Sequence, residues 1–172
     1  MTQSVELLLD PAAEAAIHDQ WVALADAGLP SALRTPAPPH HRPHITLWAG
    51  EFVPPGAEQT WAALVSDLDL HLTIGGWLVF GPRRSRCVLA RHVVTAVALL
   101  ELQAAGAEAA EADPGGHFGP GRWSPHVTVV PRIDAGQVGP ALTALEGSTA
   151  EIRAQITDCR RWDGDARAAW SL

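Results

Sequence analysis

The 172-residue chain has no lysine and no tyrosine, only two cysteines, and no uninterrupted apolar run of the length that spans a bilayer. Cys87 and Cys159 could form one disulfide. The first residues lack a basic start followed by an apolar stretch and a small-residue cleavage site, so we expect a cytoplasmic protein with reduced thiols. The net charge of −7 argues against a general basic surface that coats nucleic acid. Any anion site must be local and must use arginine.

The remaining composition, 47% hydrophobic and 18% charged residues, is typical of a globular protein, and we expect one domain over residues 1–172. Apolar periodicity and the placement of glycine and proline indicate an α+β fold, because hairpin-like neighbouring strands do not suit a doubly wound parallel sheet. The pattern predicts strands at 5–9, 44–49, 70–80, 86–94, 126–130, 150–161 and 166–171, and helices at 11–27, 55–68, 95–112 and 134–146.

The pattern His-x-Thr occurs at positions 44, 71 and 126 of a chain with eight histidines. One such match alone would be weak evidence for a motif. The segments at His44 and His126 are both preceded by proline, both follow a Pro/Gly loop that carries an arginine, and both continue as apolar strands. The segment at His71 follows acidic SDLDL, lacks the proline and runs into two glycines. We therefore interpret His71 as an ordinary strand residue.

Side chains alternate between the two faces of a strand, which sorts the residues of each motif. His44, Thr46 and Trp48 are expected on one face of their strand, and His126 and Thr128 on one face of theirs, with the intervening apolar residues in a core. One such histidine would ordinarily be a partly buried, hydrogen-bonded ring. Two matched copies favour a functional site.

Two strands of this kind, lying side by side around a cleft, would bring two imidazoles and two hydroxyls into a small volume. Because the ordinary pKa of histidine is about 6.5, one ring can accept a proton while the other donates one near neutral pH. Hydrolysis of a cyclic phosphodiester needs this chemistry: water is deprotonated, the charged phosphorus oxygens are stabilised, and the departing ribose oxygen is protonated. No metal or cofactor is required.

These motifs resemble the 2H phosphoesterase superfamily, named for two His-x-Thr/Ser-x motifs, and in particular its bacterial branch of 2′-5′ RNA ligases and RNA 2′,3′-cyclic phosphodiesterases. The 82 positions from His44 to His126 are similar to the family's usual gap, and GHFGPGRWSPHVTV resembles the segment before its second motif. The resemblance covers nearly the whole chain. It implies two pseudo-symmetric α+β lobes, each with an antiparallel sheet lining a central cleft and with helices outside, and one motif in each lobe.

The resemblance also implies a catalytic set of His44, Thr46, His126 and Thr128. Within it, His126 is favoured as the base for water and His44 as the acid for the leaving oxygen. In the reverse reaction the two roles exchange.

The chain departs from the family pattern after each motif. Relatives often carry an arginine shortly after the second motif, whereas here Pro131 intervenes and Arg132 comes six positions after His126. A Phe-Leu-Gly-like segment commonly follows the first motif, whereas here Trp48 begins a Trp-Ala-Gly segment. Substrate preference can therefore differ from that of relatives.

Six residues are candidates for substrate binding, and one of them is Arg132, which could contact phosphate if it reaches the cleft. Trp48 could stack a nucleobase or pack in the core, and Trp123 and Phe118 could form a mobile aromatic wall or simply anchor their loop. Arg42 and Arg122 each precede a motif histidine closely and could contact phosphate, or they could be solvated surface arginines.

The group His40, His41 and His44 also invites a metal interpretation, but its segment lacks carboxylate or cysteine ligands, and a metal on His44 would remove that ring from acid-base work. We expect no metal. The leading hypothesis is a monomeric, metal-independent phosphodiesterase acting on an RNA 2′,3′-cyclic phosphate end or a small cyclic nucleotide, leaving a 2′-phosphate, with reversible 2′-5′ RNA ligation as a possible second activity. The alternatives are cleavage of 2′-5′ oligonucleotides or of a nucleotide-sugar cyclic phosphate, and a non-catalytic RNA-end or nucleotide-binding module.

Overall fold

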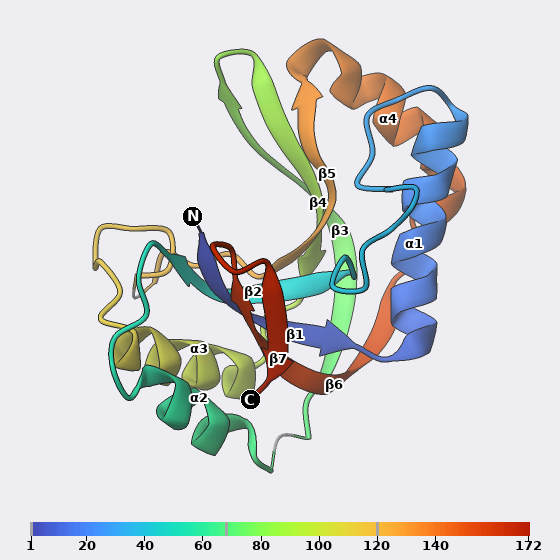
Figure 1. Cartoon of the computed structure of the whole chain (residues 1–172). Helices are drawn as coiled ribbons and strands as arrows, with labels where there is room; N and C mark the ends of the chain where they lie inside the picture. Colours follow the sequence, from blue (N-terminus) through green and yellow to red (C-terminus); the bar gives the residue numbers. More distant parts are fainter. Residues whose placement is uncertain (1, 68, 120) are drawn as a thin grey trace.

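The computed structural model describes residues 2–67, 69–119 and 121–172. Strands and helices alternate irregularly along the chain, as the sequence pattern predicts (Figure 1). Short 3₁₀ turns at Ala135–Gln137 and Glu146–Ser148 flank the last helix. The elements are β1 (Gln3–Leu9), α1 (Pro11–Asp26), β2 (His44–Gly50), α2 (Ala57–Val65), β3 (His71–Arg83), β4 (Arg86–Val93), α3 (Val97–Ala109), β5 (His126–Asp134), α4 (Val138–Ala144), β6 (Ile152–Asp163) and β7 (Ala168–Ser171).

The first helix shows why its boundaries could be predicted from the sequence. Asp10 caps α1, because its Oδ1 accepts hydrogen bonds from the backbone N–H groups of Ala12 and Ala13 at 2.9 and 3.1 Å. Pro11 occupies the first helical position, where its missing N–H costs nothing. Beyond the end of α1, Gly28 adopts a left-handed φ of 70°, which glycine accepts without strain.

All the strand pairings are antiparallel, and the strand order is β1-β2-β5-β4-β3-β6-β7, with a further pairing of β1 with β6. The strands fall into two groups, β1, β2 and β7 in one and β3–β5 in the other. β6 serves both groups, because residues 152–155 pair with β3 and residues 156–163 pair with β1. The groups also join where Ile45 of β2 pairs with Val127 of β5.

The helices lie outside the strands in two pairs (Figure 1). α1 and α4 run together on one side, where α1 packs against β5 and β6. α2 and α3 pack against each other on another side, with α3 against β2 and α2 against β6. None of the described helices is long and apolar enough to cross a membrane.

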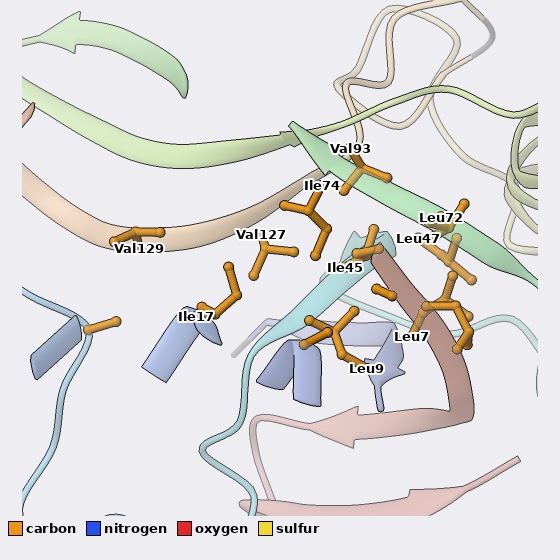
Figure 2. Close-up of a cluster of buried hydrophobic side chains, with 14 of the residues drawn as sticks. Leu7, Leu9, Ile17, Ile45, Leu47, Leu72, Ile74, Val93, Val127 and Val129 are labelled. Atoms are coloured by element: carbon orange, nitrogen blue, oxygen red, sulfur yellow. The ribbon is translucent and has the colours of Figure 1, made fainter. Parts of the chain in front are cut away.

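Both strand groups contribute to one apolar core (Figure 2). Ile45 and Val127 lie within it, near Ile74 of β3, with Ile17 of α1 on the side of Val127, and all four are fully buried. The pair that joins the two groups is therefore excluded from water on its inner face, which stabilises the connection by apolar burial.

A buried arginine links β3 and β4 to the segment before β6. Arg91 of β4 is fully buried and donates hydrogen bonds to the carbonyl oxygens of Gly75, Ser148 and Ala150 at 2.6–2.8 Å. Its guanidinium lies 4.8 Å from the ring centroid of Trp77. Burial lowers the pKa of Arg91. The side chain thus fastens the segment before β6 to β3.

Each motif strand contains a β-bulge directly after its threonine. In β2, Thr46 pairs with Glu6 and Trp48 pairs with Val5, which leaves Leu47 as the extra residue. In β5, Thr128 and Val130 pair with consecutive residues of β4, which leaves Val129 as the extra residue. A bulge of this kind interrupts the alternation of faces along a strand.

The last predicted helix differs from the observed one at its start. The sequence pattern predicts a helix from residue 134, but β5 continues to Asp134 and α4 begins only at Val138. Pro131 does not end the strand, because it lies in a second irregularity of the β4–β5 register, where no ladder hydrogen bond from its nitrogen is required.

Candidate active site

The pairing of Ile45 with Val127 brings the two motifs together. In this antiparallel register, His44 lies across from Thr128, and Thr46 lies across from His126. The paired residues point into the core, whereas the four motif side chains are half-buried on the opposite face. The histidines are diagonal neighbours, a relation that separates side chains by roughly 7–8 Å and leaves room for a small group between the rings.

Both imidazoles are held in the same way. The Nδ1 atom of His44 lies 2.8 Å from the carbonyl oxygen of Arg42, and that of His126 lies 2.7 Å from the carbonyl oxygen of Ser124. A carbonyl only accepts, so each Nδ1 carries the proton and donates it. This arrangement leaves the Nε2 atom of each ring to take up or release a proton.

The two threonines are anchored through their backbones by indole rings. Trp123 donates from Nε1 to the carbonyl oxygen of Thr46 at 3.0 Å, and Trp21 donates to that of Thr128 at 3.3 Å. Trp123 was one candidate for a mobile aromatic wall. In the structure it is half-buried and fastens the loop before β5 onto β2, which agrees with the anchoring alternative.

The surroundings of His44 include a buried carboxylate. The Oε1 atom of Glu6 lies 3.6 Å from His44 Nε2 and accepts a hydrogen bond from the Ser4 hydroxyl at 2.7 Å. Its Oε2 atom accepts from Arg160 at 2.7–2.9 Å. Burial alone would raise the pKa of Glu6, but His44, Ser4 and Arg160 together bring it below its ordinary value of 4.5. Glu6 is therefore ionised at neutral pH.

His126 has a different environment. The ring of Phe80 lies over it, with centroids 4.7 Å apart. Burial lowers the pKa of His126 below its ordinary value of 6.5, the hydrogen bond to Ser124 opposes this by less, and the nearby His44 lowers the pKa further. His126 is therefore mostly neutral at pH 7. The two motifs are alike in sequence and unlike in electrostatics.

A model of the 2′-5′ RNA ligase superfamily matches residues 9–167. The chain belongs to the 2′-5′ RNA ligase superfamily. The match spans both motif strands and all four helices, so the resemblance inferred from the sequence is confirmed.

Solved structures show the same fold at low sequence identity. TT0787 of Thermus thermophilus is 15% identical, with 100% of this chain and 95% of that chain covered and a TM-score of 0.59. Kluyveromyces marxianus Usb1 with uridine monophosphate is 11% identical, with 99% and 97% covered and a TM-score of 0.58. Escherichia coli LigT complexed with ATP is 13% identical, with 99% and 93% covered and a TM-score of 0.53. No curated protein matches the sequence. The predicted α+β fold is confirmed.

For this member of the 2′-5′ RNA ligase superfamily, one aromatic candidate was misplaced by the sequence argument. Strict alternation predicts Trp48 on the face of His44, but the bulge at Leu47 turns Trp48 into the core, where it is buried. Phe118 is half-buried against the same core. Both line a separate pocket of about 420 Å³ near Phe52 and are absent from the lining of the pocket beside His44.

The arginine candidates are placed differently from one another. Arg42 is engaged by Glu14 of α1, with its Nε atom 3.0 Å from the Oε2 atom. This ion pair with a carboxylate raises the pKa of Arg42, so the side chain is a structural partner of α1 in this conformation. Arg122 and Arg132 are exposed, and their proposed contacts with phosphate stay predictions.

The remaining histidines fall outside the catalytic pair. His71 is exposed and lies 3.2 Å from Asp69, whereas His41 has its Nε2 atom 2.7 Å from the Ala32 carbonyl oxygen and its ring beside Trp21. His40 packs against Trp162. Within residues 2–67, 69–119 and 121–172, no group of three or more His, Cys, Asp or Glu side chains is arranged to hold a metal ion.

Sequence reasoning missed Glu6, Arg160 and Phe80. Glu6 and Arg160 are 154 positions apart, and nothing in either segment indicates an ion pair. One signal for Glu6 was present, because a single acidic residue interrupts the apolar strand SVELLL. A buried carboxylate needs a cation, and this need could have prompted a search for its partner.

Proposed function

We propose that the protein is a metal-independent phosphodiesterase that hydrolyses a 2′,3′-cyclic phosphate, at an RNA end or on a nucleotide, to a 2′-phosphate. The observation that carries this proposal is the matched pair of Nδ1-anchored imidazoles, His44 and His126, diagonal to each other across the β2–β5 pairing. Membership of the 2′-5′ RNA ligase superfamily supports the reaction class.

The reaction divides between the two rings according to their surroundings. The Nε2 atom of neutral His126 removes a proton from water, and the water oxygen bonds to phosphorus. The bond between phosphorus and the ribose 3′-oxygen breaks, and His44 Nε2 gives that oxygen its proton. The hydroxyls of Thr46 and Thr128 donate hydrogen bonds to the phosphorus oxygens as negative charge develops on them. Phosphate stays on the 2′-oxygen.

The carboxylate of Glu6 supports the assignment of His44 as the acid. It supplies a negative charge on the side of His44 Nε2 and is itself balanced by Arg160. The separation of 3.6 Å is longer than a hydrogen bond, so the Nε2 proton is not committed to Glu6 and can go to the leaving oxygen. Glu6 is thus proposed as a positioning residue.

The test is hydrolysis of 2′,3′-cyclic AMP and of a short RNA with a cyclic phosphate end, in EDTA, with products identified by chromatography. His44→Ala and His126→Ala are each expected to lose at least about 100-fold in kcat, because each removes one proton-transfer group. His71→Ala is the matched control, since it alters a third His-x-Thr segment whose ring is exposed and paired with Asp69.

Three outcomes would count against the proposal. They are an inactive wild type on both substrates, a 3′-phosphate product, and loss of activity in His71→Ala equal to that in His44→Ala. Loss of activity in EDTA would contradict only the claim that the reaction needs no metal ion, and the proposed phosphodiesterase reaction would remain. Incubation of the RNA that carries the 2′,3′-cyclic phosphate with a 5′-hydroxyl RNA would reveal 2′-5′ joining, in which the 5′-hydroxyl takes the place of water and His126 and His44 keep their roles as base and acid.

A further inference from the structure

A pocket of about 750 Å³ opens beside His44. Its walls come from segments far apart in sequence: β1, the loop between α1 and β2, the start of β2, the end of β6, and the connection from β6 to β7. The volume lies in the range of pockets for small organic ligands, roughly 300–1,000 Å³. His126 is not among its lining residues, so the pocket extends from the acid side of the proposed active site.

An aromatic shelf forms part of the pocket. The rings of His40 and Trp162 lie 4.4 Å apart between centroids, with 33° between their planes. Both side chains are half-buried, so part of each ring still faces the pocket. A stacked pair of this kind offers a nucleobase a flat apolar surface that tolerates any base.

The pocket is also locally basic in an acidic protein. Its lining contains three arginines against one glutamate, a formal charge of +2 with histidines neutral, whereas the whole chain carries −7. Arg160 is engaged by Glu6. Arg34 and Arg167 are exposed and, within the described part of the chain, have no carboxylate oxygen within 4.0 Å. Their guanidinium groups are therefore available to a phosphate.

We propose that this pocket binds the nucleoside whose ribose carries the cyclic phosphate, with its base on the His40–Trp162 shelf and its 5′-phosphate on Arg34 and Arg167. The inference rests on the proposed function, because His44 as the acid must reach the ribose 3′-oxygen, which places the ribose on the His44 side. An RNA end carries a 5′-phosphate on its last nucleoside, whereas a free 2′,3′-cyclic mononucleotide does not. The pocket thus selects RNA ends.

The experiment compares three substrates that differ by one group at a time. They are ribose 2′,3′-cyclic phosphate without a base, 2′,3′-cyclic AMP, and 2′,3′-cyclic AMP that also carries a 5′-phosphate. kcat/KM is measured for the wild type, for Trp162→Leu, and for the double variant Arg34→Gln with Arg167→Gln. Trp170→Leu and Arg153→Gln are the matched controls, because both residues lie outside this pocket's lining. Melting curves of all the variants check folding.

Each variant is expected to erase a different preference. The wild type prefers substrates with a base, and Trp162→Leu reduces that preference roughly tenfold, since one base–aromatic stack is lost, while the baseless substrate is unaffected. The wild type also prefers the 5′-phosphorylated substrate by roughly fivefold or more, and the double arginine variant abolishes this preference alone. Added salt weakens the same preference, because the arginines are exposed. The control variants retain both preferences.

The proposal is overturned if the wild type does not distinguish the three substrates, or if the Trp162 and arginine variants slow all three equally. Calorimetric binding of adenosine 5′-monophosphate separates this outcome from failure of the proposed function. If the wild type hydrolyses nothing but binds this nucleotide about tenfold more tightly than Trp162→Leu does, the pocket stands and the reaction is wrong. If hydrolysis is lost in the two histidine variants but the Trp162 and arginine variants bind the nucleotide as tightly as the wild type, the proposed reaction is supported and the proposed pocket is wrong.

Discussion

At the scale of single residues, the two motifs show how one side-chain type is placed in two different environments. In both His44 and His126 the Nδ1 atom is hydrogen-bonded to a backbone carbonyl oxygen. The two residues differ in what lies against the rest of the ring. A carboxylate lies beside one ring, and an aromatic side chain covers the other. The proposed division into acid and base therefore rests on the surroundings that Glu6 and Phe80 provide, and neither residue belongs to a motif.

The pH dependence follows from the environment of His126. Because burial lowers its pKa below 6.5 and the base works only when neutral, the acid limb of kcat/KM on 2′,3′-cyclic AMP is expected below pH 6.5. Phe80→Ala exposes the ring to water, so the limb should move up towards 6.5. A pH–rate profile of both proteins measures this. A wild-type limb at or above 6.5, unmoved by Phe80→Ala, would contradict the assignment of His126 as the base.

Sequence reasoning reached the catalytic candidates because their signal is local. The alternation of side chains along a strand is sufficient to place His44 and Thr46 on one face. This argument holds only up to the first β-bulge. Trp48 was misassigned because the pairing partner at Val5 determines where the bulge falls. Arg160 could not be assigned at all, because its significance depends on Glu6, which is adjacent only after folding.

At the scale of secondary-structure elements, the packing of α2 on α3 depends on a missing side chain. Gly106 lies inside α3, where glycine costs about 1 kcal/mol relative to alanine. A Cβ atom at this position would lie 1.9 Å from the ring of Trp61, a fully buried residue of α2. The indole thus occupies the space that an alanine methyl would need, and close helix packing outweighs helix propensity.

Gly106→Ala is therefore expected to destabilise the protein by about 2 kcal/mol, in spite of the better helix propensity of alanine. Gly136→Ala, in the 3₁₀ turn before α4, is the matched control. Nothing lies within 4 Å of its added Cβ, so that variant should be neutral or more stable by up to about 1 kcal/mol. Urea unfolding of both variants measures the difference. Equal stability of the two variants would show that α2 moves away from α3 at no cost.

The existence and type of the elements could be predicted from periodicity, but their ends were less accessible. Pro11 and Gly28 marked the limits of α1 because proline and glycine act locally. The strand predicted at 126–130 stops before Pro131, yet β5 continues to Asp134 through a register shift. Such a shift depends on the partner strand β4, and one strand's sequence does not contain it.

At the scale of the whole molecule, the active site depends on a narrow connection between the two strand groups. β2 and β5 join at Ile45 and Val127. The motif side chains belong to the residues on either side of this pair and lie on the opposite face of the two strands. The core that stabilises the protein thus also sets the distance between His44 and His126. Two motifs 82 positions apart become one site only because both strand groups contribute to one core.

Ile45→Val tests this dependence. Removing one buried methylene is expected to cost about 1 kcal/mol of stability and to lower kcat by roughly threefold to tenfold, since small displacements of catalytic groups are expensive. Ile133→Val, also fully buried but at the far end of β5, is the matched control and should lose similar stability with kcat unchanged. Urea unfolding and turnover of 2′,3′-cyclic AMP measure both effects. Equal kcat in the two variants would show that the histidines are positioned without the β2–β5 pairing.

The two bulges that follow Thr46 and Thr128 have a consequence for how this sequence can vary. Up to each threonine, every second position is reserved for chemistry. Leu47 in one strand and Val129 in the other are the extra residues of the bulges. Each bulge shifts the alternation of faces by one position, so the residue that follows it is buried. Before each bulge, packing residues and motif residues alternate, whereas beyond it selection acts on packing alone. The core beyond each bulge can drift without disturbing the reacting groups.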